Sequence, residues 1–281
     1  MIDISFKSSI YLHNKILKWE GMDDKETFVK NCKEYPNSKS LKYYKENPIE
    51  YSFNNYGFRT SDDFNDTEYG NVFLGCSHTM GLGHHLENSW SYKVNKEVGG
   101  KFWNLSQGGS GIQTAFRLLY GFKDYLKVKN IFHLVLFHPR YEFIQEDRVI
   151  KLANWMIDDK IQSDNEPTIL EYWDNGEEKR TEINSFKEFY VNILGSSSHT
   201  VYTNESYIYA LKGLAKEMGC NYYYLTEYDV DYVEDYSYSC YPAWERSLKE
   251  DPMEARDLGG HATVGQLDFI YKKFLKATNE L

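Results

Sequence analysis

The chain has 281 residues, of which 41% are hydrophobic and 26% charged, enough to bury the core of one large domain. Its net charge of −10 and its lack of a basic cluster argue against nucleic acid or an anionic membrane as the main partner. We also expect a cytoplasmic protein with reduced thiols, because no signal peptide or membrane-spanning stretch is seen and the four cysteines are scattered.

Residues 1–69 show weak hydrophobic periodicity and many polar side chains. We expect an irregular N-terminal extension here, with short helices and a strand. The segment 54–57, Asn-Asn-Tyr-Gly, has the composition of a turn, because Asn and Gly tolerate a positive φ. The main domain is expected to span residues 70–281.

From residue 70 onward, short apolar runs alternate with segments of helical periodicity. The apolar runs predict strands, at residues 71–76, 101–105, 130–137 and 220–225. The helical periodicity predicts helices, at residues 87–98, 112–126, 203–218 and 263–277. Nearly continuous apolar strands that alternate with helices are typical of a parallel sheet covered on both faces. The sequence therefore predicts an α/β fold.

Residues 139–197 interrupt this alternation. They are polar, contain Pro167, and include an acidic stretch at 174–178. We interpret them as a lid-like insertion that shapes specificity.

The first predicted strand of the main domain ends in a glycine-rich segment, residues 75–81 (GCSHTMG). Ligands of open α/β sheets bind beyond the carboxyl ends of the strands, so this segment is a candidate site. Its glycines lack the spacing of a nucleotide-binding loop. His78, His84 and His85 lie close in sequence, but adjacent histidines rarely share one ion and no further ligand stands at a suitable spacing. We therefore expect neither a nucleotide nor a metal here.

Ser77 is the candidate nucleophile of this segment. A serine hydroxyl needs a base, a group that orients the base, and donors for the oxyanion. At the strand end Ser77 can project its Oγ into the crevice, where backbone N–H groups can stabilise negative charge. The base has to come from another loop, and Asp257 and His261 lie together in one short loop before the last predicted helix.

These segments resemble the sequence blocks of the SGNH, or GDSL-type, hydrolase superfamily. The first block, GDSxTxG, matches residues 75–81, with Cys76 in place of the usual aspartate. The second, similar to NLGxxG, matches residues 104–109, with Gly109 (or Gly108) as the oxyanion glycine. The last, DxxH, is similar to residues 257–261, which carry one extra residue. The match spans about residues 70–275, and NNYGFR at 54–59 resembles a segment often found upstream of the first block.

The resemblance implies a three-layer α/β/α fold with a flavodoxin-like parallel sheet of the SGNH hydrolase type, here with an N-terminal extension and an insertion. It also implies a serine esterase in which Ser77 attacks, His261 is the base and Asp257 orients it. Short acyl esters, including acetyl groups on carbohydrates, are the implied substrates, and no metal or organic cofactor is needed.

The third block is where the chain departs from the family. The family carries GxN(D) after the third strand, and the asparagine donates to the oxyanion, whereas this chain has Phe137-His138-Pro139-Arg140. His138 or Arg140 can supply the missing donor. Otherwise the oxyanion hole rests on the backbone N–H groups of Ser77 and Gly109 alone.

Each of these residues also has a purely structural interpretation. Ser77 can cap a helix, Gly109 can serve a turn, and Asp257 can pair with Arg256. Cys76 is a rival nucleophile, but the alternation of a strand directs it to the packing beneath Ser77. Three functions therefore stay open: an ester hydrolase, an acyltransferase with the same triad, and a hydrolase-like binding or structural module. The sequence does not indicate the oligomeric state.

Overall fold

The computed structural model describes residues 16–19, 25–60, 62–64, 67–136, 139–145, 148–153, 168–173, 178–182, 189–226 and 264–279. The N-terminal part contains β1 (Ile16–Trp19), α1 (Lys25–Glu34), α2 (Lys39–Glu46) and β2 (Ile49–Ser52). Next come β3 (Tyr69–Leu74), α3 (Ser77–Met80), the 3-10 turn η2 (Leu86–Asn88), α4 (Trp90–Val98), β4 (Lys101–Asn104), α5 (Ile112–Phe122) and β5 (Lys127–Val135). The chain continues with β6 (Arg140–Gln145), β7 (Arg148–Ala153), β8 (Thr168–Trp173), β9 (Glu178–Glu182), the π-helical turn η4 (Tyr190–Leu194), α7 (Ser197–Met218), β10 (Asn221–Thr226) and α9 (Val264–Asn279).

The apolar runs predicted as strands form one parallel sheet of order β10-β5-β3-β4. Because β3 lies between β4 and β5, the chain moves outward from β3 to β4 and then crosses back over β3 to reach β5. Such a reversal creates a switch point beyond the carboxyl ends of β3 and β5, where open α/β sheets bind their ligands.

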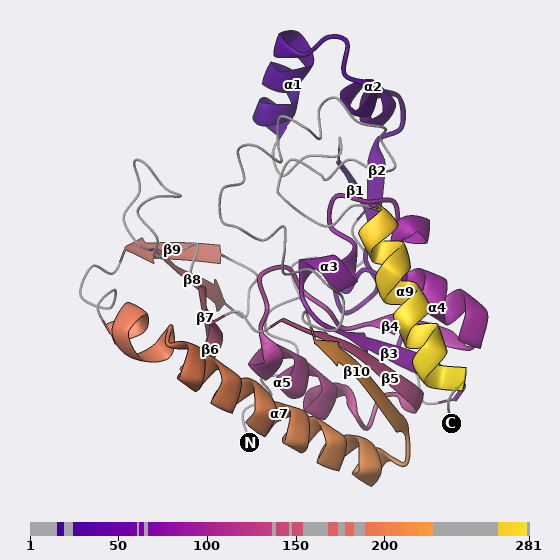
Figure 1. The fold of residues 1–281 in the computed structure, drawn as a ribbon, viewed down its shortest axis with the longest axis vertical. Coiled ribbons are helices and arrows are strands. Elements are labelled where there is room, and N and C mark those ends of the chain that lie inside the picture. The colour runs from indigo at the N-terminus through magenta and orange to yellow at the C-terminus, as the bar shows by residue number, and fades with distance from the viewer. Residues whose placement is uncertain are drawn as a thin grey trace.

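Helices cover both faces of this parallel sheet (Figure 1). Val72 and Leu74 of β3 pack on one face with residues of α5 and α7. Phe73, between them, packs on the other face with residues of α4 and α9. The pleat of a strand turns alternate side chains to opposite faces, and both faces are apolar here because both are buried. The predicted α/β class is thus confirmed, with a parallel sheet between two helical layers.

A row of asparagines (Asn71, Asn130 and Asn221) crosses the buried sheet at register partners on β3, β5 and β10. Asn130 Nδ2 donates to Asn71 Oδ1 (2.8 Å), and Asn221 Nδ2 donates to Asn130 Oδ1 (3.0 Å). Asn71 Nδ2 also donates to Asn95 Oδ1 (2.8 Å) on α4. A slip of one residue between the strands would leave buried amides unpaired, so the asparagine row fixes the register.

The predicted insertion contains a four-stranded antiparallel sheet of order β6-β7-β8-β9. The sequence analysis predicted no strand within this polar stretch. Figure 1 shows the antiparallel sheet beside α5 and the start of α7. Tyr141 of β6 donates a hydrogen bond of 2.5 Å from its Oη to the carbonyl of Leu194 in η4. The antiparallel sheet is therefore attached to the main body through buried polar contacts.

The N-terminal part has a small core of its own. Strands β1 and β2 pair antiparallel, and the core consists of Phe28, Leu41, Tyr44, Ile49, Tyr51 and Phe53. In Figure 1, α1 and α2 lie on the same side of the parallel sheet as α3. The predicted turn at 54–57 is confirmed, because the N–H of Gly57 (φ 77°) donates to the carbonyl of Asn54 (3.0 Å).

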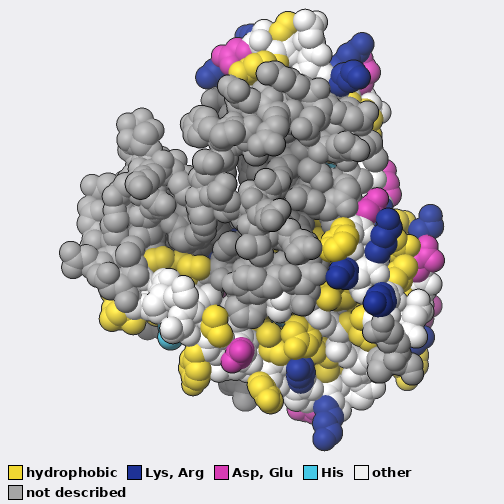
Figure 2. All heavy atoms as spheres, viewed as in Figure 1, with side chains coloured by type: hydrophobic (Ala, Val, Ile, Leu, Met, Phe, Trp, Pro, Cys, Tyr) yellow, Lys and Arg dark blue, Asp and Glu magenta, His cyan; other side chains and the backbone are white. Residues whose placement is uncertain are grey.

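On the face drawn in Figure 2, basic, acidic and hydrophobic side chains are interspersed over the region of α4 and α9. Such mixing is typical of a solvated helical surface. Among the described helices, none combines the length and apolarity needed to cross a membrane.

Candidate functional site

Strand β3 ends in a tight turn that puts Ser77 directly beyond its carboxyl end. Gly75 has a φ of 147°, Cys76 is the N-cap of α3, and Ser77 is the first residue of that helix. Gly81 ends the helix in the left-handed conformation, with a φ of 75°. Ser77 therefore lies on the side of the sheet where the switch point is found.

Steric constraints require glycine at positions 75 and 81, on either side of Ser77. A Cβ atom at Gly75 would lie 2.2 Å from Oγ1 of Thr79, in addition to the strain of its positive φ. A Cβ atom at Gly81 would lie 2.9 Å from Cβ of Ser89 and 3.2 Å from Nη1 of Arg59. A side chain at either position would push the turn away from its neighbours, so the two glycines help to determine the position of Ser77.

Ser77 and Cys76 are both buried, with 7% and 2% of their surfaces exposed. Within the described residues, the hydroxyl of Ser77 has one hydrogen bond, over 3.9 Å to Sγ of Cys76. Cys76 is the more deeply buried of the two, but both residues follow the end of β3, so the alternation of a strand does not extend to them.

Asn104, the last residue of β4, holds the second sequence block against α3. Its Nδ2 donates to the carbonyl of Thr79 (3.1 Å), which also accepts a bond of 2.9 Å from Oγ of Ser91. Its Oδ1 accepts from the backbone N–H of Ser106 (3.1 Å). This buried amide therefore joins the helix that carries Ser77 to the loop after β4.

That loop makes a turn at residues 107–110, the 107–110 turn. The N–H of Ser110 donates to the carbonyl of Gln107 (3.3 Å), and Gly109 has a φ of 70° at the third position, as a type II turn requires. Oγ of Ser110 and N–H of Gln107 both donate to the carbonyl of Gly75, over 2.9 and 3.4 Å. The turn with the predicted oxyanion glycine is thus bonded to the residue that precedes Cys76 and Ser77.

Of the other predicted site residues, Asp257, His261 and His138 lie outside the described residues. Arg140, at the start of β6, lies against the second sequence block. Its Nη1 donates to the carbonyl of Ser110 (3.3 Å), and a Cβ atom at Gly111 would lie 2.6 Å from the Arg140 carbonyl oxygen.

Arg59, in the segment NNYGFR, connects the N-terminal part to the loop after α3. Its buried guanidinium donates to the carbonyls of Gly81 (2.5 Å) and His84 (2.8 Å) and stacks on the ring of Tyr51 at 4.1 Å. Burial lowers the pKa of Arg59 to about 10. No side-chain pattern in the sequence reveals the role of this arginine, because its partners are backbone carbonyls.

A buried ion pair lies between α5 and the antiparallel sheet. Nε and Nη2 of Arg117 donate to the two carboxylate oxygens of Glu142 (2.5 and 3.0 Å), and Oγ1 of Thr114 donates to the same carboxylate (2.7 Å). The side chains of Arg117 and Glu142 are 5% and 4% exposed. Burial by itself would raise the pKa of Glu142, but the charge and hydrogen bonds of Arg117 outweigh it and the pKa is lowered.

Lys151 of β7 is the register partner of Glu142 and is also buried, with 4% of its surface exposed. Its Nζ donates to Oε1 of Gln107 (2.9 Å), the first residue of the 107–110 turn. Burial lowers the pKa of Lys151 to about 8, against the attraction of Glu142 and with the repulsion of Arg117. Sequence reasoning missed this lysine because charged residues in strands are normally exposed. The apolar residues around it, Val149-Ile150 and Leu152, were the available signal for a strand.

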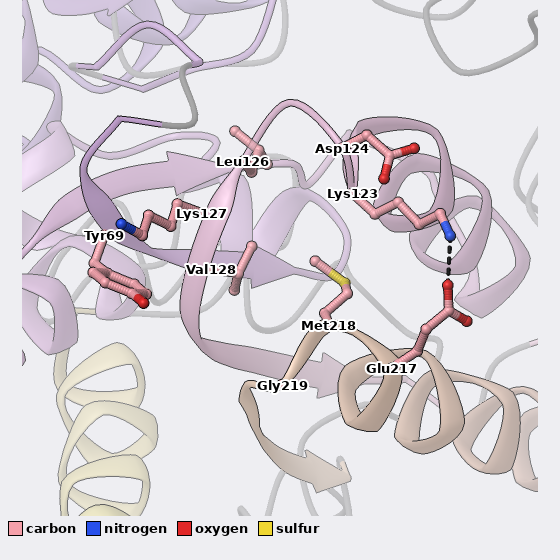
Figure 3. A pocket seen from close by; sticks show the side chains of 9 residues that line it. All are labelled: Tyr69, Lys123, Asp124, Leu126, Lys127, Val128, Glu217, Met218 and Gly219. Carbon is pink, nitrogen blue, oxygen red and sulfur yellow. Dashed lines mark hydrogen bonds and ion pairs between the residues drawn. The ribbon is translucent and has the colours of Figure 1, made fainter.

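A surface cavity of about 290 Å³ lies at the other end of the parallel sheet (Figure 3). It is lined by residues at the amino ends of β3 and β5 and by the end of α7, where Lys123 pairs with Glu217 (2.6 Å). Since Ser77 follows the carboxyl end of β3, this cavity does not belong to the candidate site.

Within the part of the chain that the structure describes, no group of three or more His, Cys, Asp and Glu side chains could hold a metal ion. Comparisons with protein-family models, curated proteins and solved structures found no match.

Proposed function

We propose that the protein is a serine ester hydrolase of the SGNH type that acts on short acyl esters, including acetyl groups on carbohydrates. One observation carries the proposal. The turn that holds Ser77 and the 107–110 turn, which holds Gly109, are bonded to each other at the switch point through the carbonyl of Gly75. An acyl-transfer site needs this pairing of a nucleophile and a second source of backbone N–H groups.

The strand order supports the finer fold assignment. Counted from β3, the parallel strands follow the order 2-1-3-4, which begins the flavodoxin-like order. The first loop of such a sheet, here the turn after β3, is a usual location for ligand-binding residues.

In the proposed reaction, Oγ of Ser77 attacks the acyl carbonyl carbon while His261 accepts the hydroxyl proton. Asp257 holds the imidazole in the required tautomer and stabilises its protonated form. The tetrahedral intermediate collapses, His261 returns the proton to the departing alcohol, and an acyl-Ser77 ester remains. Water, deprotonated by His261, then attacks this ester and releases the acid and free Ser77.

The oxyanion is stabilised by the backbone N–H groups of Ser77 and Gly109. Asparagine is absent from the third block, and Arg140 donates to the carbonyl of Ser110 beside the second block. Arg140 can therefore hold that loop in place. Arg140 and His138 are the two candidates for the third oxyanion donor. One missing donor costs a factor of about 10²–10³ in rate.

The test combines covalent labelling with turnover. A fluorophosphonate probe is expected to label Ser77, and the protein is expected to hydrolyse p-nitrophenyl acetate. The Ser77→Ala and His261→Ala variants should each lose at least about 10³-fold in turnover, whereas Cys76→Ala should keep both labelling and activity. Undiminished turnover in Ser77→Ala would exclude the proposal, and a loss confined to Cys76→Ala would identify the thiol as the nucleophile. Measuring free acetate with and without an added alcohol separates hydrolysis from acyl transfer.

A further inference from the structure

One of the contacts between the antiparallel sheet and the candidate site is made by a buried amine. Lys151 extends from β7 to Oε1 of Gln107, across the space between the antiparallel sheet and the loop after β4. A lysine is rarely buried to this degree, because removing an ammonium group from water is costly unless it is paired. This cost indicates that the contact with Gln107 has a role beyond packing.

Lys151 lies among both acidic and basic side chains. The groups that face it include Glu142 of β6, Arg117 of α5 and the neutral amide of Gln107. Glu142 already receives two hydrogen bonds from Arg117 and one from Thr114, so its charge is largely committed to the arginine. The hydrogen bond to Gln107 (2.9 Å) is therefore one of the contacts that stabilise the buried lysine.

The 107–110 turn depends on anchors at its ends. Gly108 is exposed, and among the described residues no atom lies within 4 Å of the position of a Cβ atom built on it. Gly109 likewise has no side chain to hold it, and glycine is the residue with the greatest conformational freedom. Ser110 is anchored to Gly75, and Gln107 is anchored by its backbone to Gly75 and by its side chain to Lys151.

We propose that Lys151 is a positioning residue of the active site: by holding the side chain of Gln107, it fixes the 107–110 turn and with it the N–H of Gly109. The antiparallel sheet is then a part of the oxyanion-binding apparatus and not only a lid. This inference rests on the proposed esterase function for its catalytic consequence. The anchoring of the turn can be measured independently of any activity.

The experiment compares Lys151→Met, Gln107→Leu and the double variant by hydrogen exchange of residues 105–111. Each single variant is expected to speed exchange at Gly108–Ser110 by about fivefold or more. The double variant should be no faster than either single variant, because both changes break the same contact. Lys123→Met is the matched control, since it removes a lysine that pairs with Glu217 at the other end of the sheet. It should leave exchange at 105–111 unchanged.

The catalytic consequence is read as turnover of p-nitrophenyl acetate per labelled Ser77. Lys151→Met and Gln107→Leu should each lower kcat about tenfold, with KM nearly constant, and the double variant should lose no more. Lys151→Arg and Gln107→Glu keep a donor and an acceptor and should restore most of kcat. If Lys151→Met does not fold, Gln107→Leu and Gln107→Glu give the same test, since both leave the pair Arg117–Glu142 intact.

Unchanged exchange at 105–111 in the single variants, or additive effects in the double variant, would overturn the inference. Faster exchange with kcat unchanged per labelled site would overturn its catalytic part. If Ser77 of the wild-type protein is not labelled at all, the proposed function fails, while the exchange data still decide whether Lys151 anchors the turn.

Discussion

Thr79 occupies the space in which a side chain at Gly75 would lie, with its Oγ1 only 2.2 Å from the position of a Cβ atom. Gly75 and Thr79, which lie two residues before and two residues after Ser77, are therefore in close contact. The threonine has a packing role in the segment GCSHT, and the glycine is required by both its φ of 147° and its neighbour. The position of the candidate nucleophile thus depends on residues that take no part in chemistry.

Gly75→Ala should destabilise the protein by about 2–4 kcal/mol, from backbone strain and the clash with Thr79 together. Gly219→Ala is the matched control, because Gly219 has a φ of 67° but open space around its Cβ position. It should cost only about 1 kcal/mol. Urea denaturation of both variants measures the difference, and equal losses would contradict the steric role of Thr79.

Asn130→Ala should cost about 1–3 kcal/mol, because it leaves the fully buried Oδ1 of Asn71 without its donor. Asn221→Ala removes the other end of the asparagine row, where the residue is exposed. Its loss should be below about 1 kcal/mol, since water replaces the missing partner. Midpoints of urea unfolding give the order, and an Asn221→Ala loss as large as that of Asn130→Ala would argue against the asparagine row as a buried register device.

Arg59→Lys should destabilise the protein by about 2–3 kcal/mol, because one ammonium group cannot serve the carbonyls of Gly81 and His84 with the geometry of a guanidinium. Labelling of Ser77 by the fluorophosphonate probe should slow at the same time, since both carbonyls belong to the loop after α3. Lys123→Met is the control, because it removes a cation at the other end of the parallel sheet, and it should leave the labelling rate unchanged. Full labelling rates in Arg59→Lys would show that the loop keeps its position without the guanidinium.

The lowered pKa of Lys151 predicts a pH dependence of stability. The folded protein loses this proton near pH 8, whereas the unfolded chain keeps it up to the ordinary value of 10.5. Between these values the unfolded state binds more protons, so stability rises with pH, by roughly 3–4 kcal/mol at most. Below pH 8 both states are protonated and the full cost of burying the charge is present.

Lys151→Met removes this titration and leaves the other groups in place. Plotted against pH from 7.5 to 10.5, the difference in unfolding free energy between wild type and variant should shift in favour of the wild type. Guanidinium denaturation at several pH values measures it. Parallel stability curves would mean that Lys151 has the same pKa in the folded and the unfolded state.

The parallel sheet and its helices could be predicted from the sequence because their pattern is local. Apolar runs such as Val72-Phe73-Leu74 are buried on both faces, and the glycines after them punctuate the strand ends. The observed strand boundaries differ from the predicted ones by a few residues. For example, β5 begins at Lys127 and not at 130, because exposed lysines alternate with buried residues at its start and interrupt the apolar run. The turn at 54–57 was predictable for the same local reason.

The antiparallel sheet could not be predicted in this way. Its strands carry charged residues such as Glu142 and Lys151, which look like solvent-facing positions, but their partners are on α5 and in the loop after β4. Arg117 and Glu142 are 25 residues apart in sequence, so no periodicity links them. The candidate triad shows the opposite case. Ser77, Asp257 and His261 were suggested by a resemblance, and the last two lie outside the described residues.

The pair Arg117–Glu142 limits how this fold can be edited. Deleting residues 140–182 to obtain a minimal α/β domain would leave the buried Arg117 of α5 without the carboxylate of Glu142. An uncompensated buried charge of this kind costs about 3–5 kcal/mol, a large part of the stability of a typical domain. The strands β6–β9 therefore cannot be removed without destabilising α5. A chimeric protein that takes α5 from this chain has to take the antiparallel sheet with it.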